Sequence, residues 1–229
     1  MLLAARYGPR MRKTTRPVDL RRAILDASLA LVESEGVGGL SMREVTRRAG
    51  VTHGAPYHHF VDRAAILAAI ADEGFALLTA RMSAARARAR TPRARFEACG
   101  SAYVTFAMEN TAHFRVMYRP ELASAREQPR LDHAASKGFE LLVQCVKECQ
   151  DAGVAPKGDP LPLVITSWST AHGLAALWVD GPMSRGVKGV RGDPKRLVAL
   201  VARTLGGLLE AAAHSATRAE RGRGSRAKR

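Results

Sequence analysis

One stretch of the sequence, SMREVTRRAGVTHGAPYHHF at residues 41–60, concentrates side chains that suit contact with a polyanion. Arginine can hydrogen-bond with two prongs to guanine edges, while tyrosine, histidine and hydroxyl groups can bond bases or phosphates. Arg43 and His53 are the candidates for base contact. Gly54 and Ala55 have almost no side chain, so the backbone there can approach another surface closely. This chemistry favours binding to double-stranded DNA.

Two short helices must position these groups. Ser41 can cap the first helix, Glu44 can reach back to it as in a capping box, and Gly50 ends it. Thr52 can cap a second short helix that runs to about Phe60. Two short helices joined at a glycine are typical of a helix-turn-helix, whose second helix enters the major groove. The pattern therefore predicts a DNA-binding unit.

The rest of the chain also has the apolar spacing of helices. We expect a first helix over 20–35 and a long one from residue 63 to about residue 90. Further helices are expected at about 93–109, 111–118, 130–152, 163–179 and 195–214. The predicted fold is all-α, with a three-helix helix-turn-helix DNA-binding domain and a larger helical ligand-binding and dimerisation domain.

The predicted domain organisation has four parts. A basic disordered arm is expected at 1–17, the DNA-binding domain at 18–67, the larger domain at 68–215, and a basic disordered tail at 216–229. The formal net charge of +15 suits a partner with many negative charges. Solvated tails explain the same charge without any partner, so whether the tails contact DNA stays open.

Composition also limits the location and the chemistry. No stretch approaches the roughly 18 uninterrupted apolar residues of a membrane span, and we expect a cytoplasmic protein that does not contact a membrane. Cys145 and Cys149 would share a helix face, but one such pair is a weak metal or redox signal, so we expect no metal and no cofactor. No nucleophile–base–acid set stands out, which argues against an enzyme.

The segment GVTHGAPYHHFVDRAAIL at 50–67, together with the helix before it, resembles the N-terminal domain of the TetR family of regulators over about residues 20–67. Arg63 stands where that family usually has lysine, while Ala64 and Pro56 depart from its common residues. Tyr57 bracing the motif and His59 packing on the first helix remain alternatives to phosphate contact. The residues that the chemistry and the resemblance together assign to DNA binding are Ser41, Arg43, Thr52, His53, Gly54, Ala55, Tyr57, His58, His59 and Arg63.

A second resemblance lies in WSTAHGL at 168–174 and FRVMY at 114–118, which are similar to the tryptophan–histidine–glycine subgroup of C-terminal domains in the same family. Trp168 and His172 stand one helical turn apart and so share a face. Ordinary core packing explains most aromatic residues here, and His172 could equally be an interior histidine. The candidates for lining an apolar effector pocket are Tyr103, Phe106, Phe114, Met117, Trp168 and His172.

These observations together predict a ligand-responsive, DNA-binding transcriptional regulator. The resemblance implies a homodimer, which as a repressor would be released from a near-palindromic operator by a small apolar or amphipathic effector. The alternative is a nonspecific nucleic-acid-binding or architectural protein without a small-molecule ligand. The identity of the effector, the operator, the target genes and the choice between repression and activation lie beyond the sequence.

Overall fold

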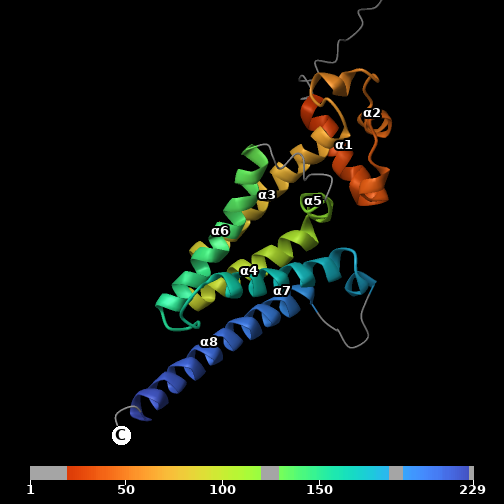
Figure 1. Cartoon of the computed structure of the whole chain (residues 1–229). Coiled ribbons are helices and arrows are strands. Elements are labelled where there is room, and N and C mark those ends of the chain that lie inside the picture. The colour runs from red at the N-terminus through yellow and green to blue at the C-terminus, as the bar shows by residue number, and fades with distance from the viewer. Residues whose placement is uncertain (1–19, 120–128, 186–192, 227–229) are drawn as a thin grey trace, which may run out of the picture.

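The computed structural model describes residues 20–119, 129–185 and 193–226 (Figure 1). Every regular element in those ranges is helical, which confirms the all-α prediction. The α-helices are α1 (Leu20–Glu35), α2 (Met42–Ala49), α3 (Arg63–Arg88), α4 (Pro92–Glu109), α5 (Thr111–Met117), α6 (Pro129–Asp151), α7 (Leu161–Val179) and α8 (Pro194–Arg226). Short 3₁₀ turns are η1 (Val37–Gly39), η2 (Ala55–His58) and η4 (Pro182–Arg185).

A small N-terminal unit forms one end of the molecule (Figure 1). Its helices α1 and α2 contact each other, η2 contacts both, and α1 also contacts α3. Ile24 and Leu31 recur on one face of α1, and both are fully buried with Val45 of α2. Phe60, which follows η2, is buried in the same core. The apolar face of α1 thus packs against the short elements that contain residues 41–60.

The larger helical unit is built around α4, which contacts α3, α6, α7 and α8. Helix α3 runs from the N-terminal unit into this larger one (Figure 1), so the two share a continuous backbone. Helix α5 crosses α3 at Gly74, where an added Cβ would lie 2.8 Å from the sulfur of Met117. A methyl group at this position would therefore force the buried Met117 side chain to shift.

The second short helix of the DNA-binding unit differs from the prediction. It is a four-residue 3₁₀ turn, and its N-cap is Gly54 with no side-chain cap bond, so Thr52 does not cap it. The amide of Ala55 instead donates to the backbone carbonyl of Thr52 at 3.0 Å. Gly54 precedes the turn and Pro56 lies in its first turn, where a helix tolerates a missing backbone donor, so residue type does not separate a short helix from this tight turn.

The last helix is longer than the prediction. Helix α8 continues to Arg226, so residues 216–226, expected in a disordered tail, extend it. The extension contains alanine, arginine and glutamate, which are good helix formers, together with the poor helix formers Gly222 and Gly224. The basic arm predicted at 1–17 lies outside the described residues. In Figure 1 the end of α8 lies far from α1 and α2, so this basic extension is remote from the N-terminal unit.

One stretch of α8, Pro194–Arg218, is long and apolar enough to cross a membrane by length and composition, which is weak evidence because a core helix passes the same test. Val198 and Leu209 of this stretch are buried, and α8 contacts α4. Arg93 of α4 donates a hydrogen bond to Glu210 of α8. These contacts cover only part of α8, because 28% of its most apolar window is buried and Leu200 and Leu208 remain exposed.

Candidate nucleic-acid interface and effector cavity

Most of the predicted DNA-binding residues are exposed on the small N-terminal unit. Ala55 and Arg63 are half-buried. The exposed ones are Ser41, Arg43, Thr52, His53, Gly54, Tyr57, His58 and His59. Because α2 and η2 are in contact, the residues of the two segments lie on neighbouring elements. We call Ser41, Arg43, residues 52–54 and residues 57–59 the exposed edge.

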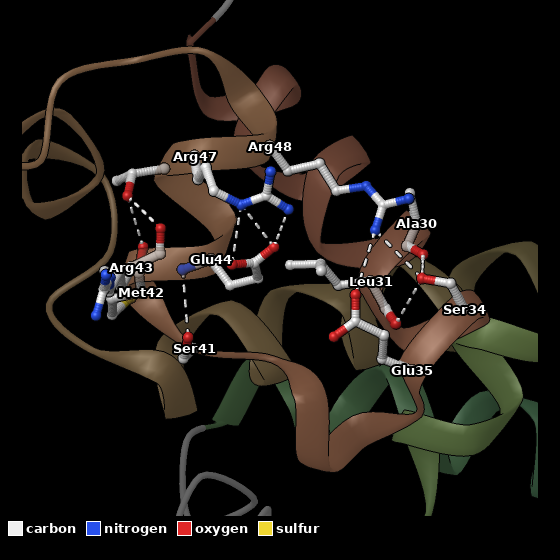
Figure 2. Close-up of polar contacts among 11 residues, drawn as sticks. Ala30, Leu31, Ser34, Glu35, Ser41, Met42, Arg43, Glu44, Arg47 and Arg48 are labelled. Atoms are coloured by element: carbon white, nitrogen blue, oxygen red, sulfur yellow. Dashed lines mark hydrogen bonds and ion pairs between the residues drawn. The ribbon is translucent and has the colours of Figure 1, made fainter.

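Helix α2 contains three arginines, and two of them, Arg47 and Arg48, bind other side chains of the N-terminal unit. Ser41 caps the helix by accepting the amide of Glu44 at 3.2 Å. The Glu44 carboxylate accepts a hydrogen bond from Arg47, and this bond lowers the pKa of Glu44. Of the two bonds of the predicted capping box, therefore, the one from the Glu44 amide to Ser41 forms, while the Glu44 side chain binds Arg47 instead. Arg48 donates to Ser34 of α1 at 3.2 Å (Figure 2).

Arg43, in contrast, makes no hydrogen bond or ion pair through its guanidinium with any described residue. Its side chain is exposed, and Figure 2 shows it apart from the Arg47 and Arg48 contacts. An exposed guanidinium at the start of α2 can bind a base edge without breaking a hydrogen bond or an ion pair to a described residue.

The 3₁₀ turn is anchored from beneath by two buried residues, Pro56 and Phe60. The Phe60 ring also receives the guanidinium of Arg21, whose carbon lies 5.4 Å from the ring centroid. Tyr57 remains 49% exposed, and its ring meets that of His53 edge-on at 6.1 Å. With Pro56 and Phe60 buried, the rings of Tyr57 and His53 lie on the exposed side of the turn. The partial burial of Tyr57 also suits the alternative in which its ring braces the motif.

Arg63 has a structural contact that sequence reasoning missed. Its Nε donates to the carbonyl of Leu40 at 2.8 Å, and one terminal nitrogen donates to the carbonyl of Val37 at 2.9 Å. The start of α3 is thereby tied to the segment before α2. In the sequence, the one hint of this contact is that a basic residue directly follows the capping residue Asp62. Phosphate contact by Arg63 stays a prediction.

A cavity of about 300 Å³ lies among α3, α4, α6 and α7 and brings together two of the predicted effector-binding residues, Tyr103 and Trp168. Tyr118, just after α5, also lines it. An adjoining, narrower cavity of about 50 Å³ shares Tyr103 and Trp168 and extends between α4 and α8. Mainly apolar lining with a few polar groups is usual for small-molecule sites.

His172 does not line this cavity, but it is hydrogen-bonded to the lining residue Tyr103. The Tyr103 hydroxyl is 2.7 Å from Nδ1 of His172 and 3.0 Å from the Tyr118 hydroxyl. Burial raises the pKa of the Tyr103 hydroxyl and lowers that of His172, so both groups are neutral near pH 7. The role of Tyr118 was missed, although it ends the FRVMY segment that suggested the site.

The other three candidates have different positions. Phe114 packs its ring against His172, with centroids 5.3 Å apart, and so supports the polar group from behind. Phe106 and Met117 are fully buried and line neither of the two cavities. Met117 instead packs against Gly74, as described above. Side-chain type alone could not separate these core positions from the lining.

The three cysteines are free and buried. Cys145 lies on α6 with Cys149 one turn later, and its sulfur is 3.4 Å from that of Cys99 on α4. Within the described residues, no group of three or more His, Cys, Asp or Glu side chains could hold a metal ion. The contact between Cys99 and Cys145 joins two helices and was not foreseen.

Two family descriptions match the chain. Residues 24–70 match the bacterial regulatory proteins of the tetR family, and residues 96–205 match the tetracyclin repressor-like C-terminal domain. The chain belongs to the TetR family. TetR proteins are transcription regulators with a helix-turn-helix DNA-binding domain, and homodimers and a cytoplasmic location are typical of them. Membership of the tryptophan–histidine–glycine subgroup stays a prediction.

Individual relatives agree with this assignment. The A-factor receptor protein of Streptomyces griseus is 41% identical over 63 residues, which cover 28% of this chain and 23% of that protein. The chain spans about a quarter of the length of the curated relatives that it matches. A structure from Rhodococcus sp. RHA1, described as a protein with unknown function, has a TM-score of 0.71 and 33% identity over 87% of this chain and 100% of its own.

A more distant neighbour is the transcriptional regulator FadR from Bacillus subtilis, solved in complex with stearoyl-CoA. Its TM-score is 0.65 at 17% identity, with 80% of this chain and 96% of that chain covered. At this identity the likeness concerns the fold alone.

Proposed function

We propose that this TetR-family chain is a cytoplasmic, ligand-responsive repressor, which binds a near-palindromic operator as a homodimer and leaves it when a small molecule enters the cavity. The exposed edge would lie in the major groove, with Arg43 and His53 at base edges and with Tyr57, His58 and His59 at phosphates. The observation that carries the ligand response is the position of α5 between the cavity and α1.

On its cavity side, α5 leads directly into the effector site. The ring centroid of Phe114 is 5.3 Å from that of His172, and the centroid of Tyr118 is 4.7 Å from the same histidine. A compound that displaces the Tyr118 or Trp168 ring would therefore press on the last turn of α5.

On its other side, α5 holds the C-terminal end of α1. A terminal nitrogen of Arg115 lies 3.4 Å from the carbonyl oxygens of both Val32 and Glu33, and its Nε donates to Asp180, at the end of α7, at 2.8 Å. Thr111 donates to the Glu33 carboxylate at 2.8 Å.

A second link reaches the first turn of α1. Glu73 on α3 accepts from Arg22 of α1 at 2.6 Å and lies 3.1 Å from Nε2 of His113 on α5. Helix α5 thus contacts the C-terminal end of α1 directly and its first turn through Glu73. Effector binding would shift the population towards a state in which α1, and with it the exposed edge, is rotated.

The proposed dimer would pair α7 and α8 with their copies. These helices expose large apolar side chains at Leu161, Ile165, Leu177, Leu200 and Leu208. Apolar side chains on two neighbouring helices suit a self-complementary interface, and the two-fold axis would present two exposed edges to adjacent turns of DNA.

Selection of binding sites from random duplex DNA by the full chain, followed by footprinting, tests the proposal. We expect an enriched site with two inverted halves whose centres are about one helical turn, or a multiple of it, apart. Uniform protection without an enriched sequence would instead support the nonspecific, architectural alternative and overturn the regulator proposal.

A further inference from the structure

The larger cavity contains no charged side chain among the lining residues that the structure describes. Most of these residues are aromatic or aliphatic, and the exceptions are a serine, a glycine and tyrosine hydroxyls. The lining comprises Phe75, Leu78, Met82, Tyr103, Tyr118, Ala135, Ser136, Gly138, Phe139, Leu142 and Trp168. The adjoining cavity contains one carboxylate, Glu97, which already accepts from Arg93 at 2.8 Å.

The aromatic side chains form an arrangement suited to a flat guest. Phe75 meets Tyr118 edge-on, with centroids 5.6 Å apart at 84°. Phe139 meets Trp168 at 6.1 Å and 77°, and Trp168 lies 6.3 Å from Tyr118. Rings in such contacts can still offer a face or an edge to a further ring in the cavity beside them.

The polar groups of the lining are hydroxyls, which both donate and accept hydrogen bonds. Tyr103 and Tyr118 are joined at 3.0 Å, with His172 2.7 Å from Tyr103, and Ser136 lies on the α6 side of the cavity. A neutral hydroxyl or carbonyl group on a ligand can join such a chain. A carboxylate or phosphate would lose its water without gaining a cationic partner from the described lining residues, and that loss is costly.

We propose that this cavity binds an uncharged compound of one or two fused rings with a single hydroxyl or carbonyl group, and that it discriminates against carboxylates and acyl-CoA thioesters. A volume of about 300 Å³ is at the small end of ligand sites, which favours a compact guest. The proposal names the effector class, so it rests on the proposed function.

Isothermal titration calorimetry of the full chain without DNA tests the chemistry directly. The compounds are 1-naphthol, 1-naphthoate with the same rings and a negative charge, and palmitoyl-CoA. We expect 1-naphthol to bind at least about tenfold more tightly than either anion, because only the anions bury an unpaired charge. Equal or tighter binding of either anion, or no binding of 1-naphthol, would overturn the proposal.

A matched pair of variants locates the binding. Trp168→Ala removes a wall of the cavity, whereas Trp178→Ala removes the other tryptophan of the same helix, which lines neither cavity. We expect the first to weaken 1-naphthol binding by about tenfold or more and the second to leave it nearly unchanged. Equal loss in both variants would place the compound elsewhere and overturn the site.

The comparison of the three compounds with unmodified protein does not depend on how either variant folds. The DNA selection tests the regulator proposal and the calorimetry tests the effector class, so either proposal can be refuted without the other. An enriched operator with preferred anion binding would remove only the effector class. Preferred 1-naphthol binding without any enriched operator would remove only the regulator proposal.

Discussion

Replacing Arg43 by alanine tests the exposed edge in a way that separates base reading from charge. A two-pronged contact between arginine and guanine is worth about 1–3 kcal/mol of discrimination. Because the Arg43 guanidinium has no hydrogen-bond or ion-pair partner among the described residues, its removal breaks none of these bonds. We therefore expect operator affinity to fall between about fivefold and 150-fold with the melting temperature unchanged.

Arg47→Ala supplies the matched control, because it removes the same charge from the same helix. The Arg47 side chain is 70% exposed and is bound to Glu44, so we expect only a small, sequence-independent loss of affinity. Fluorescence anisotropy with the selected operator and a scrambled duplex, at two salt concentrations, measures both effects. Equal losses in the two variants, or an Arg43 loss of the same size on scrambled DNA, would refute base reading by Arg43.

Two further predictions concern the contacts of α5. Gly74→Ala should lower the free energy of unfolding by about 1–2 kcal/mol, because its Cβ would lie 2.8 Å from the Met117 sulfur, whereas Gly100→Ala, with open space around it, should raise it by up to about 1 kcal/mol. Chemical denaturation of both variants measures this, and stabilisation by Gly74→Ala would contradict the packing. Burial would raise the pKa of Glu73, but the hydrogen bonds from Arg22 and His113 outweigh it and lower the pKa in the folded state. The stabilisation is therefore present above the unfolded pKa of about 4.3 and lost as pH falls below it, so Glu73→Gln should cost about 1 kcal/mol at pH 7 and much less at pH 3. A constant difference across that pH range in denaturation curves would disprove the linkage.

The sequence predicted the long elements well because their apolar spacing is strong. The buried Ile24 and Leu31 repeat with the helical period, and the caps Ser41 and Asp62 accept the amides that such positions normally satisfy. The 3₁₀ turn at 55–58 was missed because propensity within four residues cannot separate a short helix from a tight turn. The length of α8 was underestimated because a basic segment can be either a solvated helix or a disordered tail, and charge does not separate the two.

The candidate site was less predictable because it depends on contacts between distant segments. Tyr103 and Trp168 could be proposed as lining from type and spacing, but Phe106 and Met117 are equally apolar and lie in the core instead. Tyr118 joins the site only because α5 brings it within 4.7 Å of His172, measured between ring centroids. Periodicity within one helix contains no information about such crossings.

Hydrogen–deuterium exchange of the full chain, with and without the selected operator, tests most directly whether the exposed edge is the DNA-binding surface. The account predicts slower exchange in peptides that cover residues 41–60, and no change in peptides from the basic end of α8, residues 216–226. Protection confined to the end of α8, with residues 41–60 unaffected, would contradict it.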